Sequence, residues 1–284
     1  MVATKFGLKY SSNVGFATDQ GGRGFQLPAH MAIRSDQRIF VASRGRGPTV
    51  GVQMVTRDLE FFGKIGSQGK DIGQMMEPSA IAFDSNENLY VSDEKLDRIT
   101  CFDREGELIG SWGVSGEGLG EMRRPTGLLI LDEVVYVTDA MNHRIQRYHT
   151  DGRFIDQLNT TKNTESQLRY PWGIASGINN DIYVADWGNQ QLQVFDEKYN
   201  FLYMNRGEAD LNQWALEYFE SQQDEKRARS SYVPVYKTDT NDVREISARI
   251  EPYFWDPCSV MVDRDGRAYV LETCRHRFQI FERI

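Results

Sequence analysis

Five segments of this 284-residue sequence repeat one arrangement of apolar and polar residues. The clearest copies are NLYVSDEKLDRITCF at 88–102, VVYVTDAMNHRIQRY at 134–148 and DIYVADWGNQQLQVF at 181–195. A proline precedes the first apolar segment of every copy, at Pro28, Pro78, Pro125, Pro171 and Pro257. The period is about 47 residues, and the last interval is nearly twice as long. A chain that repeats one unit in this way is constrained to stack copies of one structural element.

Each copy has the pattern of four antiparallel strands. A polar turn such as DSNEN separates the first two strands, and a turn such as TDGR separates the last two. The second strand ends on a polar residue: Ser43, Asp93, Asp139, Asp186 or Glu272. This pattern is typical of a propeller blade, because one blade alone cannot bury both faces of its sheet. We expect an all-β propeller with five recognisable four-stranded blades, and six blades as the alternative.

The pattern P-x-x-I … YVxD … NxRIQxF … G-x-F resembles the NHL repeat. The resemblance covers most of the chain except 207–256. It implies an NHL-type β-propeller, which has six blades in many members of the family. It is specific for the architecture and says far less about function.

The two ends of the chain complement each other. The last copy stops at RFQIFERI, one strand short of a full blade, while KFGLKYSSNVG precedes Pro28 as an additional strand. We expect the N-terminal strand to complete the last blade and close the ring, which removes two sheet edges. Deletion of residues 1–16 is then expected to cause unfolding or aggregation.

The segment 207–256 lacks the repeat and predicts helices between the fourth and last blades. One apolar face is formed by Leu211, Trp214, Ala215, Tyr218 and Phe219, which follow helical spacing. Asp210 and Gln213 resemble a capping box at its start. Val243, Ile246 and Ile250 indicate a second helix that ends before Pro252. The expected organisation is one propeller domain over 1–284 with a helical insertion at 207–256.

One face of the propeller is richer in recognition residues than the other. In each blade the start of the first strand lies near the end of the second strand, so the repeat prolines and the polar residues that end the second strands share one face. The insertion connects to this same face. Aromatic and arginine side chains in loops are typical of binding surfaces. The residues expected on this face are His30, Arg44, Arg46, Glu94, Trp172, Trp187, Tyr253, Trp255, Cys258 and Cys274.

The acidic residues that end the second strands have a structural interpretation. Each carboxylate is expected to accept hydrogen bonds in its own turn or to pair with an arginine five residues later. Those arginines are Arg98, Arg144 and Arg277. Gln191 takes the place of the arginine beside Asp186, which marks the fourth blade as the exception.

No catalytic, metal-binding or cofactor-binding set is predicted. His143 and His276 occupy equivalent positions in two blades, so they repeat rather than converge on a metal. The peptidyl-hydroxyglycine lyases, which share this type of propeller, place zinc-binding histidines directly after repeat prolines. Here those positions hold Ala29, Ser79, Thr126, Trp172 and Cys258. The three cysteines do not suggest a disulfide framework, and we expect them to be small buried fillers.

The composition of the chain makes some partners and locations less favoured than others. The formal charge of −8 and a pI near 5.2 disfavour a nucleic-acid partner. No apolar run has the length of a signal peptide or a membrane span, so we expect a cytoplasmic, soluble protein. The favoured function is a non-catalytic binding or scaffold propeller that recognises a protein or peptide through the insertion face. The alternative is a hydrolase or lyase that uses the central channel under a helical lid.

Overall fold

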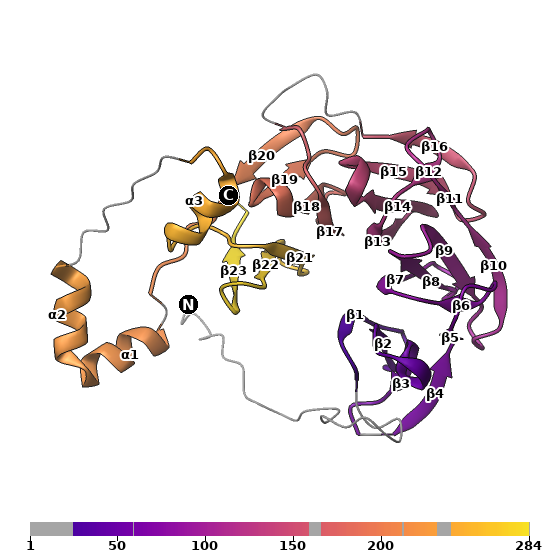
Figure 1. Ribbon diagram of the computed structural model, residues 1–284, viewed down its shortest axis with the longest axis horizontal. Helices are drawn as coiled ribbons and strands as arrows, with labels where there is room; N and C mark the ends of the chain where they lie inside the picture. Colours follow the sequence, from indigo (N-terminus) through magenta and orange to yellow (C-terminus); the bar gives the residue numbers. More distant parts are fainter. Residues whose placement is uncertain (1–24, 59, 159–165, 212, 232–239, 284) are drawn as a thin grey trace, which may run out of the picture. The chain divides into compact units, whose positions relative to one another are not determined.

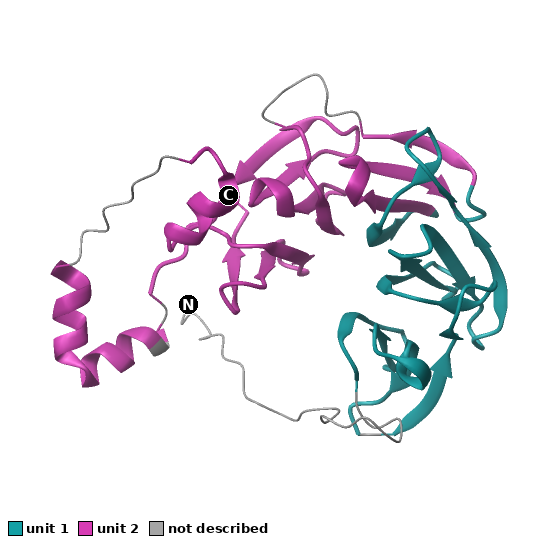
Figure 2. Cartoon of the chain, in the orientation of Figure 1, with its two compact units in different colours: residues 1–133, 150–152 teal, residues 134–149, 153–284 magenta. Residues whose placement is uncertain are grey.

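The computed structural model describes residues 25–58, 60–158, 166–211, 213–231 and 240–283. The chain divides into two compact units, coloured separately in Figure 2. Unit 1 contains residues 1–133 and 150–152, and unit 2 contains residues 134–149 and 153–284. None of the helices that the structure describes is long and apolar enough to cross a membrane.

The fold is a β-propeller of five blades, as predicted, and each repeat proline opens the first strand of a blade (Figure 1). Blade one is formed by β1 (Pro28–Ile33), β2 (Ile39–Ser43), β3 (Gly51–Val55) and β4 (Phe61–Ile65). Blade two is formed by β7 (Pro78–Phe83), β8 (Leu89–Asp93), β9 (Arg98–Phe102) and β10 (Leu108–Trp112). Short parallel pairs, β5 (Ser67–Gln68) with β6 (Gln74–Met75) and β11 (Val114–Ser115) with β12 (Glu121–Met122), follow the first two blades.

The remaining blades keep the same consecutive strand order. Blade three contains β13 (Pro125–Leu131), β14 (Val134–Asp139), β15 (Arg144–His149) and β16 (Phe154–Gln157). Blade four contains β17 (Pro171–Ser176), β18 (Ile182–Asp186), β19 (Gln191–Phe195) and β20 (Phe201–Asn205). Blade five has three described strands, β21 (Pro257–Val262), β22 (Ala268–Glu272) and β23 (Arg277–Phe281). The predicted closing strand lies in residues 1–24, outside the described residues.

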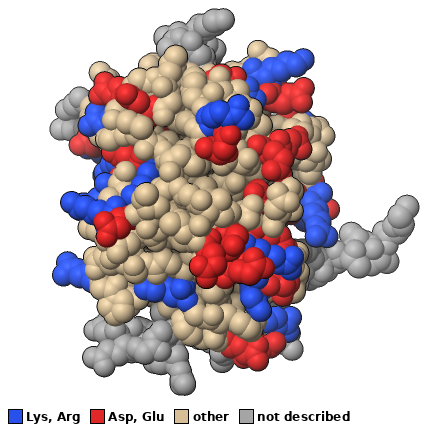
Figure 3. All heavy atoms as spheres, turned by 90° about the vertical axis from the view of Figure 1, so that its right-hand side faces the viewer, with Lys and Arg blue, Asp and Glu red and all other residues tan. Residues whose placement is uncertain are grey.

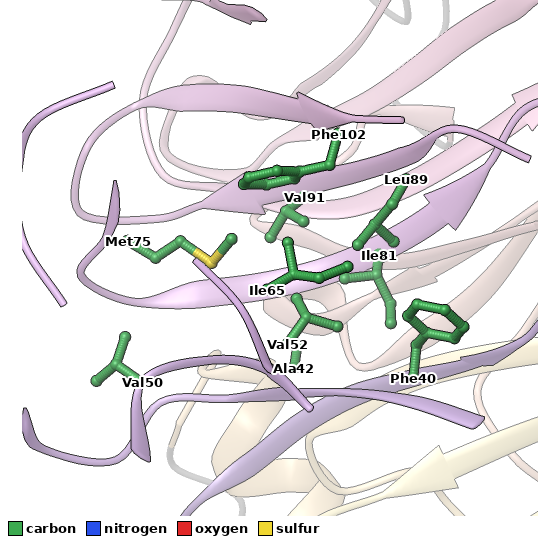
Figure 4. Packing of buried hydrophobic residues seen from close by; sticks show 10 residues of the cluster. All are labelled: Phe40, Ala42, Val50, Val52, Ile65, Met75, Ile81, Leu89, Val91 and Phe102. Atoms are coloured by element: carbon green, nitrogen blue, oxygen red, sulfur yellow. The ribbon is translucent and has the colours of Figure 1, made fainter. Parts of the chain in front are cut away.

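The core of unit 1 lies between its first two blades (Figure 4). Phe40 and Val52 come from blade one, and Ile81, Leu89 and Val91 come from blade two. All five side chains are buried, and the ring of Phe40 meets that of Phe83 edge to face at 4.9 Å. Full burial of one such side chain contributes about 1.5–3 kcal/mol, so the apolar alternation of the repeat accounts for the packing of successive blades.

A hydrogen bond that recurs between neighbouring blades explains a second feature of the repeat. In each case a side chain near the end of one blade's second strand accepts from the backbone N–H of the residue just before the next repeat proline. The pairs are Asp97 with Arg124 at 2.8 Å, His143 with Tyr170 at 3.1 Å and Gln190 with Asp256 at 2.8 Å. All six residues have positive φ, which non-glycine residues seldom adopt.

The helices of the insertion are α1 (Gln213–Ser221), α2 (Gln223–Ser231) and α3 (Val243–Arg249). They fall within the predicted segment, and α3 matches the second predicted pattern. The expected apolar face of the first helix is not uniformly buried, since Tyr218 is 51% exposed and its hydroxyl donates to Glu225 of α2. Phe219 instead lies beneath the guanidinium of Arg229, 5.7 Å away, so α1 packs on α2.

Helix α2 is a solvated polar helix. All of its residues are exposed. Glutamate, lysine, arginine and alanine are strong helix formers, which explains a helix without an apolar face. Asp224 and Glu225 in the first turn and Arg229 in the last also suit the helix dipole.

The start of α3 depends on a capping side chain. A carboxylate oxygen of Asp242 accepts from the backbone N–H groups of Arg244 at 2.8 Å and Glu245 at 3.4 Å. Replacement of Asp242 by alanine is expected to lower the free energy of unfolding by about 1 kcal/mol, whereas asparagine should retain most of it because it caps equally well. Urea unfolding of the two variants measures the difference, and equal losses would contradict the capping role.

Candidate functional site

The carboxylates that end the second strands are buried structural groups in unit 2. Asp139 is fully buried and accepts from Arg144 at 2.8 Å, as predicted. Glu272 pairs in the same way with Arg277 at 2.8 Å and also accepts from the backbone N–H of Trp255 at 2.9 Å. These side chains fix the turn at the end of each blade.

In blade two the first of the two expected arrangements is found, because Asp93 accepts hydrogen bonds in its own turn from the backbone N–H groups of Lys95 and Leu96. Arg98 donates to the backbone carbonyls of Lys70 and Gln74, at 3.0 and 2.8 Å, rather than to Asp93. Asp93 accepts instead from backbone N–H groups, including those of Met76 and Lys95. Arg98 binds backbone carbonyls here because the carboxylate of Asp93 already accepts from four backbone N–H groups.

Blade four departs from the other blades at the same place. Asp186 is fully buried and accepts from four uncharged donors, with Gln191 and Gln193 at 3.3 and 2.7 Å. The other two donors are the backbone N–H of Arg169 and the side-chain amide of Asn189. Burial without a cationic partner raises the pKa of Asp186 to about 6.

A pocket of about 450 Å³ opens beside this carboxylate. Its polar lining is formed by His143, Gln167, Arg169, Asn189, Gln191 and Arg206. Val243 of α3 completes one side. Gly188 allows this geometry because its N–H donates to the carbonyl of Arg169 at 2.7 Å, and a Cβ on Gly188 would lie only 2.4 Å from that oxygen.

Aromatic rings and arginines adjoin the pocket and form what we call the aromatic–arginine cluster: Tyr170, Trp172, Trp187, Arg206, Arg244, Tyr253, Trp255 and Arg275. The rings of Trp172 and Trp187 lie 6.3 Å apart. Three guanidiniums lie over aromatic rings, Arg244 over Trp187 at 5.8 Å, Arg206 over Tyr253 at 4.8 Å and Arg275 over Trp255 at 5.6 Å. Of the predicted binding residues in unit 2, Trp172 and Trp187 lie together, and Tyr253 and Trp255 each lie beneath an arginine.

Helix α3 is tied to the end of blade five by two arginines. Arg244 forms a two-pronged ion pair with Asp256, at 2.6 and 2.7 Å. Arg275 donates to carbonyls at the end of α3, including those of Ser247 at 2.8 Å and Ile250 at 3.1 Å. The insertion therefore builds part of the cluster rather than lying apart from it.

The predicted cysteines have structural surroundings. Burial raises the pKa of Cys258 to about 11, and its Sγ lies 3.6 Å from the carbonyl oxygen of Leu271. Burial also raises the pKa of Cys274, whose Sγ lies 3.2 Å from Asp256. A raised pKa keeps a thiol protonated and unreactive.

Three of the four predicted binding residues in unit 1 make contacts within that unit. Glu94, whose side chain is fully buried, pairs with both Arg44 and Arg124. His30 accepts from the backbone N–H of Ile81 at 3.4 Å, and burial lowers its pKa. The side chain of Arg46 is exposed. Glu94 is the least suited of these to bind a partner, because both of its carboxylate oxygens already meet guanidiniums.

Within the described residues, no group of three or more histidine, cysteine, aspartate or glutamate side chains is arranged to hold a metal ion. The histidine that lines the pocket, His143, instead accepts a hydrogen bond from the backbone, which requires its proton on Nε2. Its pKa is lowered, first by burial and then by the nearby charge of Arg169.

Comparison with known proteins agrees with the repeat pattern. The family model for the NHL repeat matches residues 168–195, which cover blade four up to the end of β19. The protein "brain tumor" of Drosophila melanogaster is 24% identical over 154 residues, 53% of this chain. The chain is an NHL-repeat β-propeller. Its match spans 14% of the length of the Drosophila protein.

Solved structures share the fold of this NHL-repeat propeller. Virginiamycin B lyase from Staphylococcus aureus has a TM-score of 0.53 at 11% identity, over 90% of this chain and 69% of that one. A streptogramin B lyase has a TM-score of 0.52 at 13% identity, over 88% and 77%. A protein of unknown function from Bacteroides thetaiotaomicron has a TM-score of 0.60 at 17% identity, over 92% and 60%. Likeness at these identities establishes the fold alone.

Sequence reasoning missed the residues that make the NHL propeller's pocket. Arg169 and Arg206 lie outside the repeated motif. They line one pocket because Arg169 lies just before the first strand of blade four and Arg206 lies just after its last strand. The replacement of the repeat arginine by Gln191 was the one signal in the sequence that pointed to this blade.

Proposed function

We propose that this NHL propeller is a non-catalytic binding or scaffold module that holds a protein or peptide on the aromatic–arginine cluster. The observation that carries the proposal is the alternation of half-exposed rings and guanidiniums, with Arg244 over Trp187 and Arg206 over Tyr253. Tryptophan, tyrosine and arginine are the residues that most often dominate binding energy at protein interfaces. The pocket beside them offers a concave site for one side chain of the partner.

Charge supports a protein partner over a nucleic acid. The formal charge of the chain is −8. On the face drawn in Figure 3, acidic and basic side chains are interspersed rather than gathered by sign. Nucleic-acid binding depends on a continuous basic surface that releases counterions.

A display selection with random peptides tests the proposal. Peptides enriched on the immobilised protein are expected to bind with a Kd in about the micromolar range, and Trp187→Ala should weaken them about thirtyfold, since loss of a hot-spot tryptophan costs about 2 kcal/mol. Trp187→Phe should retain part of the affinity. Phe61→Ala, which removes an exposed aromatic ring in unit 1, is the matched control and should change nothing.

Two results would contradict this function. One is a selection without enriched peptides, and the other is a set of peptides that bind Trp187→Ala and the control variant equally well. Thermal melts of each variant show whether the fold is retained.

The alternative proposal, a hydrolase or lyase, has support only from the fold that the chain shares with the two lyases. Mass spectrometry of the enriched peptides after incubation with the protein separates the two proposals. A binding module leaves their masses unchanged, whereas an enzyme of either class produces fragments.

A further inference from the structure

The pocket of blade four occupies the place where three of the other blades hold an arginine. Arg277 in blade five extends from the equivalent position to backbone carbonyls ahead of the repeat proline, at 2.7 Å from Glu251 and 3.2 Å from Tyr253. Arg98 does the same in blade two. Gln191 is shorter, and its amide turns to Asp186 instead. The space that a guanidinium fills elsewhere is therefore open.

Two guanidiniums line this space without compensating carboxylates. Arg206 has a buried Nε with no hydrogen-bond partner, and its Nη2 lies 3.5 Å from Ser247 Oγ, at the limit of a hydrogen bond. The guanidinium of Arg169 forms no ion pair with any residue that the structure describes, while its backbone N–H and carbonyl are both bonded. A buried N–H group without a hydrogen-bond partner destabilises the fold until an acceptor reaches it.

Two carboxylates close to the lining residues in space or in sequence have other hydrogen-bond donors. Asp186 is fully buried beneath Gln191 and Asn189, accepts four hydrogen bonds and does not line the pocket. Glu208 accepts from the side chain of Asn205 at 2.5 Å. The described lining contains no aspartate or glutamate, so an anion would meet donors on most sides.

We infer that this pocket binds an anionic oxygen group, a carboxylate or a phosphate, carried by the peptide partner. The inference rests on the proposed function for the identity of the carrier and on the two arginines for the chemistry. Guanidiniums bind carboxylate and phosphate groups through paired N–H donors, which a single point charge does not provide. The Nε2–H of His143 and the second amide N–H of Gln191, whose first bonds Asp186, add uncharged donors to the lining.

Blocked tripeptides test the pocket without knowledge of the natural partner. The central residue is glutamate, phosphoserine or glutamine, and inorganic phosphate is a fourth probe. Binding is followed by NMR through the Nε–Hε signals of the arginines, assigned with Arg206→Lys. The glutamate or phosphoserine probe, or both, should move the Arg206 signal in a saturable way, and the glutamine probe should not. Preference between the two anions identifies an acidic or a phosphorylated partner.

Three variants locate the binding. Arg206→Gln should weaken the anionic probe about tenfold, as should Arg169→Gln. Gln191→Arg should also abolish binding, although it adds a positive charge, because the restored repeat arginine fills the pocket. Arg57→Gln removes an exposed arginine of unit 1 and should have no effect. General attraction between charges predicts the reverse for Gln191→Arg, namely tighter binding.

The inference is overturned if the glutamine probe binds as well as the anionic ones, if no probe moves the Arg206 signal, or if Gln191→Arg binds anions undiminished. Its failure is distinct from failure of the proposed function. Selected peptides that bind through Trp187 while the tripeptides do not would remove the anion site and retain the binding module. Tripeptides that bind when selection yields no peptide would retain the anion site and remove the binding module.

Discussion

Replacement of Asp139 by alanine is expected to lower the free energy of unfolding by about 3–5 kcal/mol, the usual result of breaking one half of a buried ion pair. Asp139 is fully buried, and the side chain of Arg144 is only 12% exposed. Removal of the carboxylate leaves that guanidinium without its charge partner and also leaves Asn142 and Gln146 without the acceptor at 2.9 and 3.2 Å. Chemical unfolding followed by circular dichroism measures the loss.

Blade three supplies a matched control for this prediction. Asp156 pairs with Arg147 at 2.6 Å, but its side chain is 45% exposed. Because exposed pairs contribute about 1 kcal/mol or less, Asp156→Ala should cost far less than Asp139→Ala. Similar losses in the two variants would show that burial of Asp139 does not set the strength of its contacts.

The repeat predicted the blades because strand periodicity and turn residues are local properties of the chain. Every repeat proline opens a strand, and the second strands end on the predicted residues from Ser43 to Glu272. Helix α3 was predicted for the same reason, from Val243, Ile246 and the proline that follows. Helix α2 was missed because hydrophobic periodicity detects helices with an apolar face, and this helix has none.

The candidate site was predicted in part. Placing the aromatic residues of blades four and five near one another required only the topology, and Trp172 and Trp187 do lie together. The role of Glu94 was misjudged because its partners, Arg44 and Arg124, come from positions far apart in the sequence. The sequence cannot reveal such pairs, since no motif links the residues that approach one another only after blades pack.

The stability of the protein should also decrease as the pH rises from about 4 to 6, through the titration of Asp186. Burial raises the pKa of this carboxyl to about 6, above the value of 3.8 for an aspartate exposed to water. Between these values the folded protein holds a proton that the unfolded chain has lost, so each step upward in pH favours the unfolded state. A shift of this size corresponds to about 3 kcal/mol.

The variant Asp186→Asn isolates this effect, because it removes the titrating group and keeps the shape of the side chain. Urea unfolding at several pH values should show the wild-type protein losing about 2 kcal/mol relative to the variant between pH 4 and pH 6. A protonated Asp186 carboxyl needs a hydrogen-bond acceptor. The Oε1 of Gln193 is a buried acceptor that lacks a hydrogen-bond partner. A pH-independent difference between the two proteins would contradict the raised pKa.

The variant Gln191→Arg tests the raised pKa of Asp186 in a second way, because it supplies the cationic partner that blade four lacks. The new guanidinium would stand where Arg144 and Arg277 stand beside Asp139 and Glu272, 2.8 Å from the carboxylate in both cases. A cation at that distance favours the charged form of Asp186 and lowers its pKa. The loss of stability between pH 4 and pH 6 should then disappear or reverse. The same substitution is expected to close the pocket, so one variant that gains stability at neutral pH and loses anion binding would connect the missing arginine to both properties.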